Sequence, residues 1–317
     1  FNLTFTGDLD QIGSFDNNNS NIIIENGMVM ASGSCSNVIG PNDIGSSTTG
    51  GGNFGVNDID LDLLSTFATN DAAVLEFDFI PSGDSLSFNY SFGSDEYNEY
   101  VCGSVNDAFG FFLSGPGING VYSDGAINLA IIPETDNTPV TINSVNNGNV
   151  GASGTASNCA QVDPNWMNNT DYYIDNATNS DPNATQLDGF TVSLVAAAAV
   201  QCGQTYHIKI AIADAGDTAW DSAVFIEGGS FSSNSFDLIA TASISGNIIF
   251  GGDTTVVESC NDAVFQVVRP DASIEDTLLI TIGGTATNGV DYEEIDPEVI
   301  MEVGEYTVDI PLNVNAD

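Results

Sequence analysis

Apolar and polar residues alternate along several segments of this 317-residue chain with a period of two. The alternation is clearest over residues 75–79, 86–92, 109–113 and 206–212. A period of two places apolar side chains on one face of a β-strand and polar side chains on the other. Turn-forming stretches rich in Pro, Gly and Asn separate these segments, and only residues 60–67 suggest a short helix. The pattern predicts half-buried antiparallel strands.

These strands and turns predict an all-β fold, with a jelly-roll-like antiparallel β-sandwich over residues 1–236. A new series of strand-like segments begins at residues 239–250 and predicts a second domain over residues 237–317. Only about 80 residues remain for that domain, which is small on the usual size scale. The longest apolar stretch, residues 192–200, is too short to cross a bilayer and predicts a buried strand.

Residues 135–188 form a long polar stretch rich in Asn, Asp and Thr. An insert of this length without secondary structure is unusual inside a compact domain. We therefore expect it to be held in place by Cys159 and by the region around Trp166. It is also the natural candidate for a recognition surface.

The charge balance is extreme, with 44 acidic residues against 2 Lys plus Arg and a net charge of −42. Lys209 and Arg269 are the only permanent cations. This excludes a basic patch for nucleic acid and adsorption to anionic membranes. Repulsion between so many carboxylates must be offset. Two explanations remain open: a general solubility surface suited to a salty medium, or Ca²⁺ bound at selected clusters.

Five cysteines are spread along the chain without a CxxC pair. They are Cys35, Cys102, Cys159, Cys202 and Cys260. This spacing does not fit a metal site and favours disulfides in an oxidising compartment. We predict a Cys102–Cys159 bond that fastens the polar insert, and secondly a Cys35–Cys202 bond, which leaves Cys260 without a partner inside the chain.

Three acidic clusters lie at predicted strand ends, at residues 94–107, 214–222 and 57–62. Crowded oxygen ligands of this kind suit Ca²⁺, although none of the clusters matches an EF-hand. Strand ends can meet at one edge of a sandwich, so we predict a Ca²⁺ site in the first domain. It would draw on some of Asp95, Glu96, Glu99, Asp107, Asp214, Asp217 and Asp221. The alternative is that Asp214 and Asp217 form Asx turns and Asp221 caps a turn.

Catalytic chemistry is restricted by the residue types present. His207 is the only histidine, so a Ser–His–Asp or Cys–His site has no second candidate base, and its strand position indicates a structural role. Zinc and phosphoryl-transfer sites lack their ligands and cations. A glycoside hydrolase needs only two carboxylates, but its cleft usually carries more than the 2 Trp found here.

Two sequence runs resemble a known family. They are LEFDFIPSGDSLSFNYSFGSDEYNEYVCGSVNDAFGFFLSGPG at residues 75–117 and IADAGDTAWDSAVFIEGGSF at residues 212–231. Both are similar to motifs of the choice-of-anchor L family of bacterial surface domains, with Asp95 standing where a glutamate is common. The resemblance implies surface display or secretion and does not imply a reaction.

The second domain resembles a Calx-β domain in Val257-Glu258, in the GTATNGVDY run of residues 284–292 and in residues 303–305 and 315–317. The resemblance implies a smaller, truncated immunoglobulin-like β-sandwich in which Glu258, Asp291 and Asp317 bind Ca²⁺. Because the chain stops where the last third of such a domain should begin, it also implies a piece of a longer, repeat-bearing protein.

We therefore expect a non-enzymatic, calcium-stabilised adhesin or structural module of a larger bacterial protein, located outside the cell. Its expected partners are a surface polysaccharide or another surface protein, without nucleic acid binding or direct membrane insertion. The alternative is a carbohydrate-binding, lectin-like module or a glycoside hydrolase with paired carboxylates.

Overall fold

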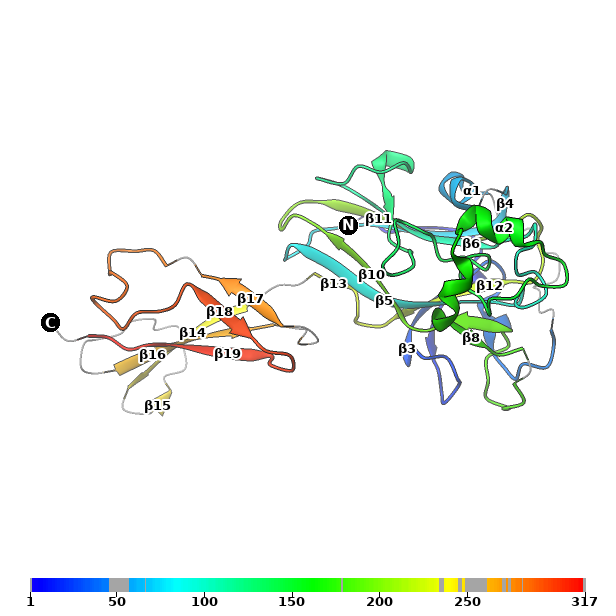
Figure 1. Ribbon diagram of the computed structural model, residues 1–317. Coiled ribbons are helices and arrows are strands. Elements are labelled where there is room, and N and C mark those ends of the chain that lie inside the picture. The colour runs from blue at the N-terminus through cyan, green and yellow to red at the C-terminus, as the bar shows by residue number, and fades with distance from the viewer. Residues whose placement is uncertain are drawn as a thin grey trace. The chain divides into compact units, whose positions relative to one another are not determined.

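The computed structural model describes residues 2–45, 57–65, 67–177, 179–233, 237–244, 247–248, 261–269, 272, 275–280 and 282–315. The chain divides into two compact units, Phe1–Ser233 and Asn234–Asp317 (Figure 1). Antiparallel strands make up most of the regular structure in both units, which confirms the predicted all-β fold.

The first unit contains two antiparallel sheets. The five-stranded sheet has the order β1 (Thr4–Thr6), β4 (Thr69–Phe79), β11 (Tyr206–Ala215), β6 (Ala108–Ser114) and β7 (Ile127–Asn128). The eight-stranded sheet has the order β2 (Ile12–Asp16), β3 (Asn26–Ala31), β12 (Ser222–Glu227), β5 (Ser85–Ser94), β9 (Gly189–Thr191) and β8 (Tyr173–Asp175), and β10 (Leu194–Ala199) and β13 (Ser232–Ser233) also pair with β5. All four segments predicted from alternation are strands, as expected.

The core of the first unit lies between the two sheets and is built from the alternating aromatic positions. Phe88 and Tyr90 on β5 each lie 4.9 Å from Phe111 on β6, measured between ring centroids. Phe92 stacks on Phe109 at 4.7 Å. These five side chains are almost fully buried. Burial of each stabilises the sandwich by roughly 1.5–3 kcal/mol, before the entropy cost of ordering it.

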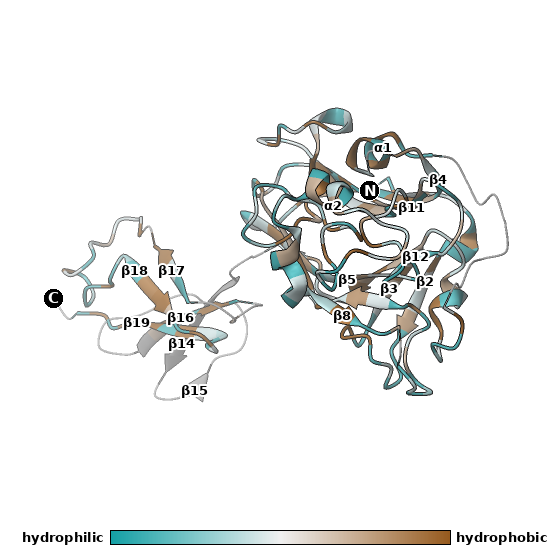
Figure 2. Cartoon of the chain, turned by 45° about the vertical axis from the view of Figure 1, so that its right-hand side comes forward, coloured by the Kyte–Doolittle hydropathy of each residue, from teal (hydrophilic) through white to brown (hydrophobic). Residues whose placement is uncertain are grey.

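The outer face of the five-stranded sheet is covered by α1 (Ile59–Ser65), close to the predicted short helix. Its buried Leu61 and Leu64 pack in one cluster with Phe112 of β6 and Ala213 of β11. Figure 2 shows that the loops around the first unit are largely hydrophilic. Among the described residues, no helix has the length and apolar character needed to cross a bilayer.

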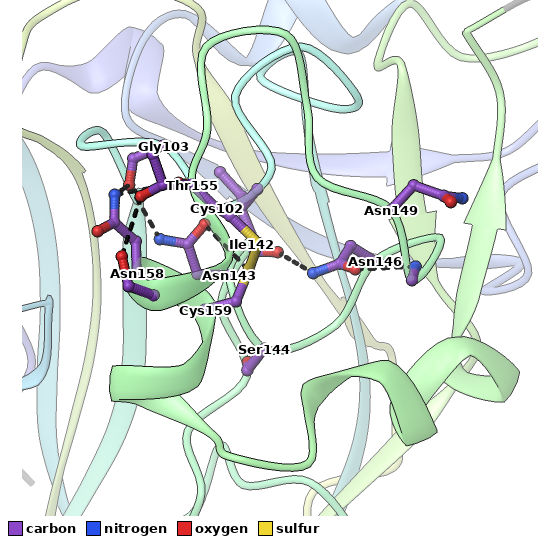
Figure 3. The surroundings of a disulfide bond; sticks show 12 residues. Cys102, Gly103, Ile142, Asn143, Ser144, Asn146, Asn149, Thr155, Asn158 and Cys159 are labelled. Atoms are coloured by element: carbon purple, nitrogen blue, oxygen red, sulfur yellow. Dashed lines mark hydrogen bonds between the residues drawn. A yellow bond between two sulfur atoms is a disulfide. The ribbon is translucent and has the colours of Figure 1, made fainter.

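The polar insert is held as predicted, because Cys102 and Cys159 form a disulfide. Cys159 lies in α2 (Ala156–Val162). Trp166 is the first residue of η4 (Trp166–Tyr172), and its side chain is buried. The Asn158 side-chain amide donates hydrogen bonds to the carbonyl oxygens of Cys102 and Gly103 at 3.0 and 2.9 Å (Figure 3). The disulfide and these amide contacts replace regular strands as the means of ordering the insert.

The predicted Cys35–Cys202 bond is wrong, since both thiols are free. Cys35 begins η2 (Cys35–Val38) and its thiol donates to the carbonyl oxygen of Val29 on β3 at 3.6 Å. Cys202 lies in an exposed turn and its thiol donates to the carbonyl oxygen of Ser82 at 3.2 Å. Cys35 therefore contacts strand β3, whereas Cys202 contacts the loop between β4 and β5. Cys260 lies outside the described residues.

Residues 192–200 were expected to form a buried strand, but the strand found there is buried on one face only. In β10, Leu194 and Ala196 are buried, whereas Val195 between them is 56% exposed. The reason is that β10 pairs only with β5, so one face of it meets the core and the other meets solvent.

The second unit has a four-stranded sheet and a two-stranded sheet. The first has the order β15 (Asn247–Ile248), β14 (Asp237–Ile244), β16 (Asn261–Val268) and β19 (Thr307–Leu312), and the second joins β17 (Asp276–Leu279) to β18 (Glu298–Met301). Val267, Met301 and Ile310 form its small core. The buried Arg269 guanidinium pairs with Asp276 at 2.6 Å and donates to the Glu305 carbonyl oxygen at 2.7 Å.

Replacing both Cys102 and Cys159 by Ala should destabilise the first unit. The disulfide closes a loop with a sequence separation of 57 residues. Loss of that constraint on the unfolded chain should lower the free energy of unfolding by about 4 kcal/mol. Denaturant unfolding of the variant measures this, and the exposed Cys202→Ala variant is the matched control. A double variant as stable as the control would contradict the assignment.

Candidate functional site

Acidic residues gather where strands of both sheets end. Asp95 and Glu96 directly follow β5, and Asp107 directly precedes β6. Asp214 lies near the end of β11, and Asp221 directly precedes β12. We call the group the strand-end cluster and define it as Asp71, Asp95, Glu96, Asp107, Asp214 and Asp221. All of these residues are at most 5% exposed.

Asp107 connects the ends of the two sheets. Its Oδ1 accepts a hydrogen bond from the backbone N–H of Ala215 on β11 at 3.0 Å. Its Oδ2 accepts from the hydroxyl of Ser222 on β12 at 2.6 Å. Because β11 and β12 belong to different sheets, one buried carboxylate bridges the two layers of the sandwich.

Asp71 enters the cluster through an irregularity in β4. The pairing of β11 with β4 shifts register between Ile212 and Asp214, and Asp71 has a φ of +54°. A bulge of this kind turns a side chain away from the regular alternation. Sequence reasoning missed Asp71, although the polar pair Asn70-Asp71 at the start of an apolar run was a usable signal. It also missed Ser32, whose hydroxyl donates to the Asp214 carboxylate.

The buried carboxyl groups repel one another. Burial raises the pKa of Glu96 well above its ordinary value, and the charges of Asp214 and Asp217 raise it further. Burial and the charge of Glu96 do the same to the pKa of Asp107, against hydrogen bonds from Ser222 and Ala215. The pKa of Asp214 is raised by burial and then by Asp107. Each shift has the same cause, desolvation of a negative charge beside others.

Two oxygen atoms of the cluster are buried without a hydrogen-bond partner, Oε2 of Glu96 and Oδ1 of Asp214. An unpaired buried carboxylate oxygen is costly, so it either takes a proton or binds a cation. No three His, Cys, Asp or Glu side chains of the described residues are grouped closely enough to hold a metal ion as they stand. Cation binding would therefore require these side chains to rotate toward a common point.

Asp217 lies outside the strand-end cluster, whereas Asp221 belongs to it. Asp217 is exposed, and its Oδ1 accepts from the backbone N–H of Ala219 at 3.1 Å, which is the Asx turn considered as the alternative. Asp221 accepts a hydrogen bond from the Asn37 amide at 2.9 Å. Asp217 still acts on the cluster through its charge.

Glu99 belongs to a different acidic group. It is exposed and acts electrostatically on Asp188, together with Asp175. Burial raises the pKa of Asp188 to about 6, while a hydrogen bond from Asn42 opposes the shift and the charges of Glu99 and Asp175 add to it.

In the second unit only one of the three predicted ligands can be placed. Asp291 is partly exposed, and its Oδ2 accepts a hydrogen bond from the backbone N–H of Thr287 at 2.5 Å. Glu258 and Asp317 lie outside the described residues.

The Asp188→Asn variant should show how this carboxyl group affects stability with pH. The pKa of Asp188 rises from 3.8 to about 6 on folding, so its contribution is complete below about pH 4 and is lost as the pH rises through 6. The asparagine side chain of the variant cannot ionise, so the free energy of unfolding of the variant should exceed that of the wild type by about 2–3 kcal/mol at pH 8. The difference should largely disappear near pH 4. Urea unfolding at both pH values measures it, and a difference independent of pH would contradict the shift.

Comparison with known proteins agrees with the sequence motifs. The family model of the choice-of-anchor L domain matches residues 1–232, nearly the whole first unit. No curated protein and no solved structure matches the chain. Domains of this family are modules of bacterial proteins that are secreted or carried on the cell surface. The chain therefore belongs to the choice-of-anchor L family.

Proposed function

We propose that this chain is a non-enzymatic structural module of a surface-displayed adhesin, and that Ca²⁺ bound at the strand-end cluster stabilises it outside the cell. The observation that carries the proposal is the pair of partnerless, buried carboxylate oxygens on Glu96 and Asp214. Hydrogen bonds satisfy both oxygens of the neighbouring Asp107, so the cluster is only partly neutralised by the protein itself.

Calcium suits this position for chemical reasons. It prefers roughly six to eight hard oxygen ligands, which carboxylates, backbone carbonyls and water can supply together. Extracellular modules bind it with dissociation constants of about 10⁻⁴–10⁻³ M, so such a site fills outside the cell. A bound cation would remove the repulsion between Glu96 and Asp214 and would fasten the ends of β5 and β11, which belong to different sheets.

Removal of Ca²⁺ should lower the melting temperature of the chain in low salt. A ligand that binds only the folded state at about 100 times its dissociation constant stabilises it by about 2.7 kcal/mol. Calorimetric melts with EDTA and with excess Ca²⁺ measure the shift. The Asp214→Asn variant should lose most of it, because it removes the negative charge of this carboxylate and replaces one of its oxygens by an amide nitrogen. Asp136→Asn, at an exposed acid in the polar insert, should keep it. Equal melting temperatures of the wild type in EDTA and in Ca²⁺ would contradict the proposal.

For the second unit we propose the beginning of a Calx-β domain. Its antiparallel sheets and the turn closed by Asp291 onto Thr287 support this, together with the sequence resemblance. The adjoining Tyr292 is buried beneath the turn at 7% exposure. In such a domain Glu258 and Asp317 would join Asp291 in binding Ca²⁺.

A second candidate function is the binding of a neutral surface polysaccharide. A cavity of about 540 Å³ lies against β2, β3 and β12 of the eight-stranded sheet. Apolar side chains including Phe15, Val29 and Phe225 line it, and the amide of Asn183 and the hydroxyl of Ser36 lie among its polar groups. Aromatic and apolar walls with a few polar groups suit small-molecule binding. Asp16 is the only acidic residue among the described residues lining the cavity, which favours binding over two-carboxylate hydrolysis.

Titration calorimetry with neutral and anionic oligosaccharides tests this candidate. Only neutral ones should bind, since the chain carries a net charge of −42. The Asn183→Ala variant should bind roughly fivefold more weakly, because one side-chain hydrogen bond contributes about 1 kcal/mol. Tight binding of acidic sugars, or unchanged affinity in the variant, would exclude this cavity as the site.

A further inference from the structure

Lys209 is the only permanent cation of the first unit, and it lies on the central strand of the five-stranded sheet. Its neighbours across the sheet are Glu76 on β4 and Phe112 on β6. The side chain leaves the sheet on the face that α1 covers and is only 11% exposed. Its Nζ lies 5.0 Å from the centre of the Phe112 ring.

The amine of Lys209 meets two carboxylates at the start of α1. Nζ lies 2.5 Å from Oδ2 of Asp60, whose side chain is 1% exposed. It also lies 3.0 and 2.9 Å from the two oxygens of Asp58. Asp58 is held in place, because its Oδ1 also accepts the backbone N–H groups of Asp60 and Leu61.

The second oxygen of Asp60 faces two hydrogen-bond donors. Its Oδ1 accepts from the backbone N–H of Ser123 at 2.8 Å and from the Ser123 hydroxyl at 2.9 Å. Donors fixed in this way stabilise the negative charge that develops on a carbonyl oxygen during nucleophilic attack. An amine, a carboxyl carbon, a donor pair and a second carboxylate therefore lie together around the buried side chain of Asp60.

We propose that Lys209 and Asp60 join in an intramolecular isopeptide bond between Nζ and Cγ. The ammonium first passes one proton to Oδ2 of Asp60, which leaves a neutral amine beside a carboxylic acid. The amine attacks Cγ, and the oxyanion forms on Oδ1 against Ser123. Asp58 then takes a proton from the nitrogen and returns it to Oδ2, which leaves as water when the C–O bond breaks. One amide and one water replace the ammonium and the carboxylate, without any co-reactant.

The pair starts as an ion pair. Burial raises the pKa of the Asp60 carboxyl, but hydrogen bonds from Lys209 and Ser123 outweigh it and keep its pKa below the ordinary value. Transfer of the proton to Asp60 is therefore uphill, and the geometry compensates for it, because the short Nζ–Oδ2 contact gives the proton a direct path. The reactants are also held together before the reaction, which removes the entropy cost of their encounter. A cavity of about 230 Å³ lined by Asp58, Asp60 and Lys209 receives the released water.

The bond would tie α1 to the central strand across 149 residues of sequence. Closing so long a loop removes conformational entropy from the unfolded chain. The inference goes beyond the proposed calcium-dependent function and does not depend on it, because no member of the strand-end cluster takes part.

The sequence offers a direct test on the wild-type chain. Lys209 is the only efficient trypsin site, because Arg269 is followed by Pro270. After reduction and denaturation, an uncrosslinked chain has its full mass and is cut into residues 1–209 and 210–317. The crosslinked chain should be lighter by one water molecule and should stay uncut, since its lysine is acylated. A wild-type chain of full mass that trypsin cuts would overturn the proposal.

Variants assign the roles of the residues. Lys209→Arg keeps the charge and should restore both the full mass and the cut. Asp58→Asn should leave most of the chain at full mass, because it removes the proton carrier. Asp62→Asn is the matched control, since Asp62 accepts from Thr69 and does not contact Lys209, and it should crosslink fully. Full crosslinking of Asp58→Asn at the wild-type rate would overturn the role of Asp58.

Discussion

The burial of carboxylates in a chain that has almost no cations constrains the whole first unit. Lys209 is its only permanent positive charge, yet carboxylates are buried both beside it and in the strand-end cluster. Around Lys209, Asp58 and Asp60 share a single ammonium, so one of their two negative charges is compensated. In the strand-end cluster, hydrogen bonds from Ser222 and Ala215 satisfy Asp107 but leave one oxygen of Glu96 and one of Asp214 without a partner. Without compensation, desolvation and repulsion would both favour unfolding.

The two places need different compensation because of where they lie in the sandwich. Lys209 reaches its partners from the middle of β11 through a long apolar stem, which packs beside Phe112. The strand-end cluster instead collects the ends of β4, β5, β6, β11 and β12, where chain reversals bring short acidic side chains together from both sheets. The one lysine of the first unit lies beside α1 and not at this cluster, so the proposed Ca²⁺ or a proton would have to compensate the charge there. The same strand ends also set the spacing between the two sheets through the contact of Asp107 with Ser222.

Alternation along the sequence predicted the strands and the aromatic core because each strand has one face toward the core. It also indicated that acidic turns at residues 94–107 and 214–222 meet, since both end strands of one sandwich. Three features of the structure could not be predicted from this alternation. Asp71 depends on a local shift of register between β4 and β11. Cys35 and Cys202 depend on the paths of two loops. The alternation places Lys209 on the outer face of its strand, where a lysine is usually exposed. Only the packing of α1 over that face brings Asp58 and Asp60 to it.

Long-range ties supplement the hydrophobic core of this unit. The Cys102–Cys159 disulfide orders the insert, Asp107 joins the two sheets, and Lys209 joins α1 to β11. Each tie links residues far apart in sequence, so each removes more freedom from the unfolded chain than a local contact would. The three also differ in chemistry: the first is a disulfide, the second a hydrogen-bonded carboxylate, and the third the ion pair that the proposed isopeptide bond would replace. A reductant would therefore break only the first and leave the contacts between the sheets and between α1 and β11 in place.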